Sequence, residues 1–127
     1  MTQEEKDLLL KDLCARLPYG VKVYGNYSYS DGDKIVDDIK IKVLDIYDID
    51  WVINNIEIKP YLLPLSSMTY EQKEKYCQLR DKLFFNDKVP PHKNIFEYIN
   101  FFYENNLDIN GLIPMDLAIN ATGLNIY

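Results

Sequence analysis

The sequence is poor in the residues on which most catalytic and metal sites depend. It contains one histidine, His92, and two cysteines, Cys14 and Cys77, which lie far apart in the chain. No His or Cys spacing matches a metal site, and there is neither a Gly-x-Gly-x-x-Gly nor a Walker A phosphate loop. A Cys or Ser triad would depend on His92, whose neighbours Pro90, Pro91 and Lys93 are typical of a surface loop. We therefore predict no cofactor and find little support for nucleophilic catalysis.

Long apolar runs and targeting signals are missing as well. No stretch approaches the roughly 18 apolar residues that a membrane span needs. The first residues, Met1–Lys6, have neither the basic region nor the apolar region of a signal peptide. We therefore expect a cytoplasmic protein with no membrane partner. Cys14 and Cys77 are then expected to be free, buried thiols of a reducing compartment rather than a disulfide.

The composition that is present is that of an acidic globular domain. The 127 residues are 47% hydrophobic and 27% charged, which predicts a single domain over residues 1–127 with its own core. The net charge of −6 argues against a nucleic-acid partner, because binding to a phosphate backbone rests on clustered Lys and Arg. The 11 tyrosines fit AT-rich codon usage, with a tyrosine-rich binding surface as the alternative.

The N-terminal pattern predicts a helix over Thr2–Arg16. Thr2 and Glu5 form a capping box, and apolar residues recur at helical spacing until Pro18 and Gly20 end the element. The side chains expected to face the core are Leu10, Leu13, Cys14 and Leu17.

A β-hairpin is predicted next, between residues 21–29 and 34–46. A two-residue loop at Asp31-Gly32 would set Val23 opposite Lys40. A three-residue loop instead gives the hairpin one apolar and one polar face, and we therefore predict it. Its cross-strand pairs are Val21 with Val43, Val23 with Ile41, and Tyr29 with Ile35. Its polar face carries Lys22, Tyr24, Asn26, Asp38, Lys40 and Lys42.

The C-terminal half predicts two further helices. Residues 45–59 fit either a short strand or a turn of helix, and both alternatives stay open. One helix begins after Thr69, with Gln72 as its capping-box partner, and ends near Phe84. Its inward side chains are Tyr76, Leu79 and Leu83. After a loop over residues 86–93, the other helix spans Asn94–Asn105, with a buried stripe of Ile95, Tyr98, Ile99 and Phe102.

The tail from Leu107 to Tyr127 is expected to be mostly irregular, because it contains Gly111, Pro114 and Gly123. The fold class predicted from these elements is α+β. It consists of a small antiparallel sheet built on a β-hairpin and packed by about three helices.

Three stretches of the chain stand out together. They are residues 8–21 (LLLKDLCARLPYGV), 58–69 (IKPYLLPLSSMT) and 108–114 (DINGLIP), followed by a terminal Tyr127. In this order they resemble an uncharacterised family of short proteins from gut anaerobes and their phages and mobile elements. The resemblance implies a mobile-element origin but no activity, since none is assigned to the family. The expected partner is a host or phage protein. The family pattern has a basic residue at Leu63 and an arginine at Asn110, where this chain departs from it.

A calcium loop is the sharpest chemical motif. Asn106, Asp108 and Asn110 occupy ligand positions 1, 3 and 5 of an EF-hand loop, and Gly111 occupies position 6. Position 12, however, is Leu117 instead of the bidentate Glu, and no amphipathic helix follows. A polar turn that ends the preceding helix, with Gly111 at positive φ, explains the same residues and is favoured. We therefore predict no metal.

An acidic cluster is the second motif. Seven aspartates against three lysines leave a charge of −4 over residues 31–50. A metal site or a mimic of a phosphate backbone would need several carboxylates on one face, whereas strand alternation sends Asp37 and Asp38 to opposite faces. A solvated hairpin edge is the favoured interpretation. The aspartates are Asp31, Asp33, Asp37, Asp38, Asp45, Asp48 and Asp50.

The favoured function is binding or interaction without catalysis, and the alternative is a small enzyme with a carboxylate- or tyrosine-based site. The predicted docking segment is Pro60–Met68, because its two prolines keep it from forming a helix or a central strand. A buried connector that crosses the core is, however, the favoured interpretation of this segment. The aromatic run Phe96–Tyr103 predicts core packing, and a homodimer contact through Phe96 or Phe101 stays open. The candidate binding residues are Tyr61, Leu63, Ser66 and Ser67.

Overall fold

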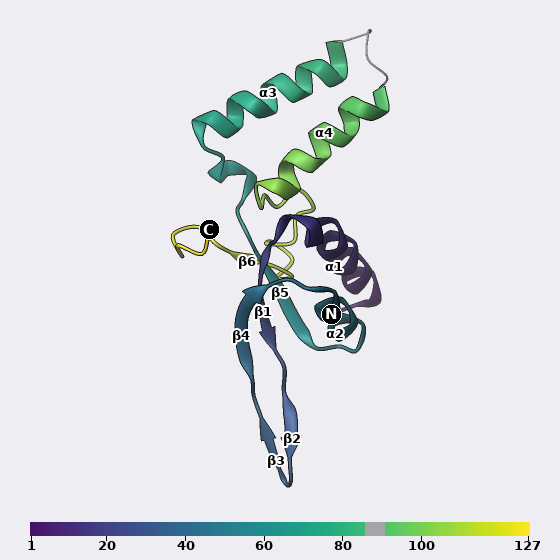
Figure 1. Cartoon of the computed structure of the whole chain (residues 1–127), viewed down its shortest axis with the longest axis vertical. Coiled ribbons are helices and arrows are strands. Elements are labelled where there is room, and N and C mark those ends of the chain that lie inside the picture. The colour runs from purple at the N-terminus through teal and green to yellow at the C-terminus, as the bar shows by residue number, and fades with distance from the viewer. Residues whose placement is uncertain (86–90) are drawn as a thin grey trace.

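A body of helices and strands carries a β arm at one end and a helical hairpin at the other (Figure 1). The computed structural model describes residues 1–85 and 91–127. In the body, α1 (Gln3–Arg16) and α2 (Ile46–Ile53) cover one face of a sheet with strand order β4-β1-β5-β6. The predicted α+β class is confirmed, although the sheet is mixed because β5 and β6 run parallel. Its strands are β1 (Lys22–Asn26), β4 (Ile39–Val43), β5 (Glu57–Leu62) and β6 (Ile119–Asn120).

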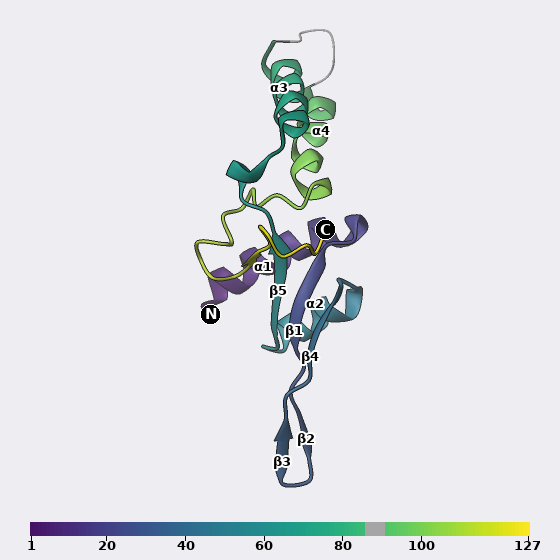
Figure 2. The same cartoon turned by 90° about the vertical axis from the view of Figure 1, so that its left-hand side faces the viewer.

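The arm is formed by β2 (Tyr29–Asp31) and β3 (Lys34–Val36), which continue β1 and β4 away from the body (Figure 2). All six residues of these strands are exposed or half-buried. A two-stranded ribbon is marginally stable on its own in water. The arm therefore depends on its base in the body for its position.

The register of the hairpin differs from the predicted one. Val23 lies opposite Lys42 and Tyr29 opposite Val36, so the three-residue loop was wrong. Asp31 pairs with Lys34, which leaves two central residues, and the first of these is Gly32 at φ 63°. Glycine at the first central position suits the two-residue turns that match strand twist. This turn chemistry outweighs the separation of apolar and polar faces on which the prediction rested.

The face that α1 turns to the core is partly the predicted one, because Leu13 is buried and Leu10 and Leu17 are half-buried against the core. Thr2 caps its first turn, since its hydroxyl accepts a hydrogen bond from the Glu5 N–H at 3.1 Å. Its buried residues are, however, Leu9, Asp12, Leu13 and Arg16. Cys14 is therefore exposed, and so is Cys77. Both thiols are free as predicted, but the prediction that they are buried was wrong.

Pro60 lies inside β5, which is a central strand with β1 on one side and β6 on the other. The prediction that prolines exclude a central strand here was therefore wrong. The cross-strand partner of Pro60 is Val23, whose backbone N–H and C=O groups point toward β4 rather than toward β5. The ladder between β1 and β5 passes through Tyr24 and Lys59 instead. Because the proline nitrogen points away from β1, its missing N–H interrupts no bond between these strands.

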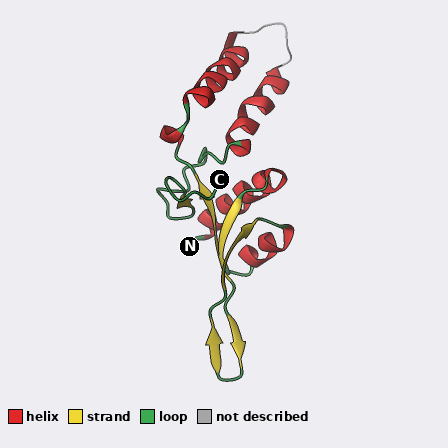
Figure 3. Cartoon of the chain, turned by 60° about the vertical axis from the view of Figure 1, so that its left-hand side comes forward, coloured by secondary structure: helices red, strands yellow, loops and turns green. Residues whose placement is uncertain are grey.

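The helices α3 (Tyr70–Phe85) and α4 (Pro91–Glu104) form the helical hairpin (Figure 3). The Thr69 and Gln72 capping box is confirmed, with bonds of 2.9 and 3.1 Å. The helix α4 begins at Pro91, a residue favoured at a first helical position, so the predicted loop is wrong for residues 91–93. Residues 86–90 of that loop lie outside the described residues. The core of the hairpin consists of Leu79, Phe101, Phe102 and Leu107.

The predicted stripe of α4 is only partly correct. Phe102 is buried and Tyr98 half-buried, whereas Ile95 and Ile99 are 41% and 36% exposed. Phe101 takes their place in the core, at 5% exposure. In the described part of the chain, α3 and α4 extend away from the body, so along most of their length each helix is covered only on the side that faces the other (Figure 3). The buried face is therefore narrower than the apolar pattern suggests.

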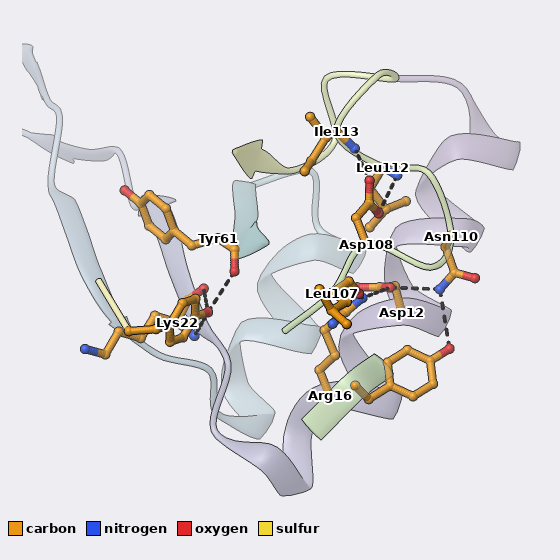
Figure 4. Close-up of polar contacts among 11 residues, drawn as sticks. Asp12, Arg16, Lys22, Tyr61, Leu107, Asp108, Asn110, Leu112 and Ile113 are labelled. Atoms are coloured by element: carbon orange, nitrogen blue, oxygen red, sulfur yellow. Dashed lines mark hydrogen bonds and ion pairs between the residues drawn. The ribbon is translucent and has the colours of Figure 1, made fainter. Parts of the chain in front are cut away.

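A buried ion pair joins the body to the chain that leaves the helical hairpin (Figure 4). The Arg16 Nε donates to Asp12 at 2.7 Å, and both side chains are fully buried. The same guanidinium donates to the carbonyl of Leu107 at 2.7 Å and lies 4.9 Å from the ring centroid of Tyr103. The Asn110 amide donates to Asp12 at 2.8 Å. These contacts tie α1 to α4 and to the loop that follows it.

We predict that Arg16→Met destabilises the protein by about 3–5 kcal/mol, because it leaves the Asp12 carboxylate buried without its partner. Urea unfolding followed by circular dichroism measures this change. The matched control is Arg80→Met, which removes an exposed ion pair with Asp81 (3.7 Å) and should cost less than about 1 kcal/mol. The double variant Asp12→Leu, Arg16→Met should be more stable than Arg16→Met alone. Equal losses for Arg16→Met and Arg80→Met would contradict this account.

The hydroxyl of Tyr127 bridges two strands where they separate. It accepts from the Lys22 N–H at 2.8 Å and donates to the Tyr61 carbonyl at 2.7 Å (Figure 4). These backbone groups belong to β1 and β5, whose direct pairing ends at Val23 and Pro60. Burial of the hydroxyl raises the pKa of Tyr127 to about 12. The C-terminal residue thus extends the sheet by one polar bridge.

We predict that Tyr127→Phe lowers the free energy of unfolding by about 1 kcal/mol at neutral pH, because two backbone groups lose a partner. A folded-state pKa above the ordinary value of 10.0 means that the neutral phenol stabilises the fold. This contribution is complete below pH 10 and is lost as the pH rises through about 12. Unfolding measured at several alkaline pH values should therefore show the difference from wild type shrinking. Tyr70→Phe, at a 75% exposed tyrosine, is the control that should change nothing.

Candidate functional site

A row of apolar side chains is exposed along the outer strand of the sheet. Ile39, Ile41 and Val43 of β4 are 57%, 60% and 52% exposed. They share the open face of the sheet with Lys22, Tyr24 and Asn26, opposite the face that α1 and α2 cover. We call residues 39–43 the β4 edge. The predicted register placed Ile41 and Val43 on the apolar face of the hairpin, together with Val21 and Val23.

The backbone of the β4 edge is also available. The bonds from Leu44 to Val21 and from Tyr27 to Asp38 fix which positions of β4 face β1. In an antiparallel ladder these positions alternate. Residues 39, 41 and 43 therefore direct their N–H and C=O groups outward. Among the described residues, no strand pairs with this side of β4. Apolar side chains and free backbone groups thus coincide at the same three residues.

A polar cluster lies beneath the other face of β4, at the base of the arm. The hydroxyl of Tyr27 donates to Asp48 at 2.5 Å, and Asp48 is fully buried. Lys42 donates to Asp45 at 2.7 Å and lies 3.3 Å from Asp48. Asp45 and Asp48 also form the capping box that begins α2. The cluster therefore ties β4 and the base of the arm to α2.

The ring of Tyr27 fits there because Gly25 has no side chain. A Cβ at Gly25 would lie 2.5 Å from this ring. The Nζ atoms of Lys40 and Lys42 are 5.8 and 5.9 Å from the centroid of the Tyr27 ring. The Trp51 ring packs edge-on against it, with the two ring centroids 6.0 Å apart. The ring is thus enclosed by strand, helix and lysine side chains.

The electrostatics of the cluster suit a structural role. Burial, together with the hydrogen bond and charge of Asp48, raises the pKa of Tyr27 far above its ordinary value. Partial burial lowers the pKa of Lys42, but the bond to Asp45 and the charge of Asp48 outweigh it and raise the pKa. The bond from Lys42 lowers the pKa of Asp45. All three groups are held in their ordinary protonation states at neutral pH, so none is prepared to act as a base or nucleophile.

The predicted docking segment is largely inside the fold. Tyr61 is 5% exposed, and Leu63 is half-buried against the core of the helical hairpin. Ser66 is exposed, and the Ser67 hydroxyl is 3.4 Å from that of Thr122. Tyr61 therefore presents almost no surface to another chain. A role of the segment in binding stays a prediction that rests on its exposed end at residues 65–66.

The residues of the calcium motif hold a turn. Both carboxylate oxygens of Asp108 accept backbone N–H groups, from Leu112 at 2.8 Å and Ile113 at 2.9 Å (Figure 4). The amide of Asn110 faces Asp12 and Tyr103 instead of a common centre. Gly111 has φ 70° and Asn106 has φ 57°. These contacts match the polar-turn interpretation of the motif.

The acidic cluster is divided among separate partners. Asp37 accepts from Ser28 at 2.8 Å, and Asp38 lies 3.2 Å from Lys40. Asp45 and Asp48 belong to the polar cluster, and Asp31 is at the exposed tip of the arm. Within residues 1–85 and 91–127, no three His, Cys, Asp or Glu side chains converge on one point that could hold a metal ion.

Two other surfaces of the described chain could bind a ligand or a partner. A cleft of about 400 Å³ lies between the start of α1, β5 and residues 115–117, and the ion pair of Lys59 with Asp116 (3.2 Å) lies at its rim. On α4, Ile95, Phe96 and Ile99 are 41%, 64% and 36% exposed. Helical residues satisfy their own backbone groups, so this second surface offers side chains alone. The β4 edge combines a row of exposed apolar side chains with outward backbone groups at the same residues.

The comparisons with known proteins identify no relative. No family model, curated protein or solved structure matches the chain. The similarity to short proteins of gut anaerobes and their phages therefore stays a prediction. In the described residues, no helix has the length and apolar character to cross a lipid bilayer.

We predict that Gly25→Ala destabilises the protein by about 1–3 kcal/mol, because the added methyl group displaces the Tyr27 ring. Trp51 is the single tryptophan of the chain, so its fluorescence reports the displacement directly. In a Tyr27→Ala background the same substitution should have almost no effect, since the clash is gone. An equal loss in both backgrounds would show that Gly25 is needed for another reason.

Proposed function

We propose that this chain is a binding protein without catalysis, which recognises an extended segment of a partner polypeptide and adds it as a strand to the β4 edge. The observation that carries the proposal is the coincidence of exposed apolar side chains and outward backbone groups at Ile39, Ile41 and Val43. In strand addition, backbone hydrogen bonds supply affinity and alternate side chains supply specificity. The β4 edge offers both.

The β4 edge supplies part of the free energy that recognition needs. Fully burying an Ile or Val side chain contributes about 1.5–3 kcal/mol, so covering the exposed half of three contributes roughly 2–4 kcal/mol. Backbone bonds at the same residues add to this figure. Exposed edge strands otherwise favour aggregation, and proteins commonly block them with charged side chains. Here Lys40 and Lys42 are engaged by Asp38, Asp45 and Asp48 on the covered face, so the open face keeps its apolar row.

The polar cluster is the obvious place for the alternative function, a small enzyme with a carboxylate and a tyrosine. Its geometry favours binding instead. The raised pKa of Tyr27 keeps the phenol protonated as a donor to Asp48, and the Asp48 carboxylate is fully buried. A partner at the β4 edge would rest on a strand that this cluster fixes to α2.

The proposal is tested by photochemical crosslinking. A benzoyl-phenylalanine in place of Ile41 should capture a polypeptide from cell extract, because the probe lies within the docked interface. The matched control carries the same probe in place of Ile53, which is 51% exposed on α2. This control should not capture the polypeptide that the probe at position 41 captures. Mass spectrometry then identifies the captured peptide. Capture at neither position, or equal capture at both, would overturn the proposed function.

A further inference from the structure

We propose that the polypeptide docked at the β4 edge is a second copy of this chain, paired antiparallel about a two-fold axis at Ile41. This inference rests on the proposed function and names its partner. Pairing of two equal edges would join two sheets into one continuous sheet. Closed two-fold dimers are the commonest assemblies of soluble proteins, and they require a surface that complements itself.

The β4 edge complements itself in sequence. Residues 39–43 read Ile-Lys-Ile-Lys-Val, so the alternation of apolar and basic side chains is the same in both directions. With the axis at Ile41, each Ile39 lies opposite Val43 of the second copy, and Ile41 lies opposite itself. The apolar row of one copy therefore continues directly into that of the other.

Backbone direction and side-chain pairing together select this register. Only residues 39, 41 and 43 direct their backbone groups outward, so the two edges can bond only through these positions. Moving the axis to Lys40 places Val43 opposite Asp37, and moving it to Lys42 places Ile39 opposite Asp45. Either shift sets an apolar side chain against a carboxylate. The axis at Ile41 alone pairs all three apolar residues with apolar residues.

The charges on the covered face are compatible with the same register. Lys40 of one copy lies opposite Lys42 of the other, which would repel if the lysines were unpaired. Each lysine already has a carboxylate, with Asp38 3.2 Å from Lys40 and Asp45 2.7 Å from Lys42. Asp38 also lies diagonally across from Lys42 of the second copy. The repulsion is thereby offset within the interface.

The arm supplies the additional contact area that a stable dimer needs. A specific interface buries about 800 Å² on each partner, which is more than a five-residue strand provides. In the proposed register Ile35 lies four residues beyond the end of the facing β4, or about 13 Å. The arm of one copy would thus pass the C-terminal segment of the other, which lies beside the Val43 end of β4 (Figure 1). Exposed apolar groups occur on both sides of this contact: Tyr29 (52%), Ile35 (79%), Leu124 (50%) and Tyr127 (48%).

Sedimentation equilibrium tests the assembly. The wild-type protein should have twice the chain mass of 15.0 kDa, with a proportion of monomer that rises on dilution. Ile41→Lys should weaken self-association by roughly tenfold or more, because it removes apolar contact at the axis and adds two facing charges. Ile53→Lys is the matched control and should stay dimeric. Circular dichroism confirms that both variants are folded. A dimer unaffected by Ile41→Lys would overturn the inference.

Disulfide trapping tests the register. In a Cys14→Ser, Cys77→Ser background, Ile41→Cys should form a crosslinked dimer on oxidation, since directly paired residues have Cα atoms about 5.5 Å apart. Ile39→Cys should crosslink with Val43→Cys but not with itself. Crosslinking through Lys40→Cys in preference to Ile41→Cys would overturn the proposed register. A monomeric wild type that captures a different polypeptide through position 41 would overturn the second copy while leaving the proposed function intact.

Discussion

The buried pair of Asp12 and Arg16 is the interaction on which the arrangement of the chain depends. It lies at the point where α1, α4 and the loop after α4 meet, and the Leu107 carbonyl and the Asn110 amide complete it. Both charges belong to α1, and the loop supplies their remaining hydrogen bonds through the Leu107 carbonyl and the Asn110 amide. Because buried charged groups without hydrogen-bond partners are unfavourable, these bonds hold the loop in place. That loop leads into β6 and then to Tyr127, whose hydroxyl bridges β1 and β5. The ion pair and the Tyr127 bridge thus link the helical hairpin, the sheet and the C-terminus.

A second constraint, the two-residue turn at the tip of the arm, decides what the sheet presents to solvent. A strand has side chains at a period of two, so a shift of one residue in pairing exchanges its faces. The turn at Gly32 sets the pairing register, and this register places Ile39, Ile41 and Val43 on the open face. At the other end of the arm, the hydrogen bond from Tyr27 to Asp48 of α2 stabilises the same register. Local turn geometry therefore creates the apolar row.

The parts of the fold that local signals determine could be predicted from the sequence. Helix starts at Thr2 and Thr69 follow from side chains that bond the first turn, and the α+β class follows from the sequence of periodic segments. The buried face of α1 was predicted only in part: Leu13 is buried as expected, but Asp12 and Arg16 look like surface residues in the sequence and are buried as a pair. For β4, the alternation of Ile and Lys predicts a strand, but not which of its two faces is covered. The candidate site was missed for that reason.

The same ambiguity explains why the β4 edge is informative. In a monomer, the more favourable register would bury Ile41 and Val43 and expose the lysines. This is the register that the apolar pattern predicts. The structure has the opposite arrangement, with lysines engaged by carboxylates and the isoleucines in solvent. A sequence whose turn, glycine and capping residues all favour this register is consistent at each local level. These local features therefore place Ile39, Ile41 and Val43 in solvent. A strand docked at the β4 edge would bury them.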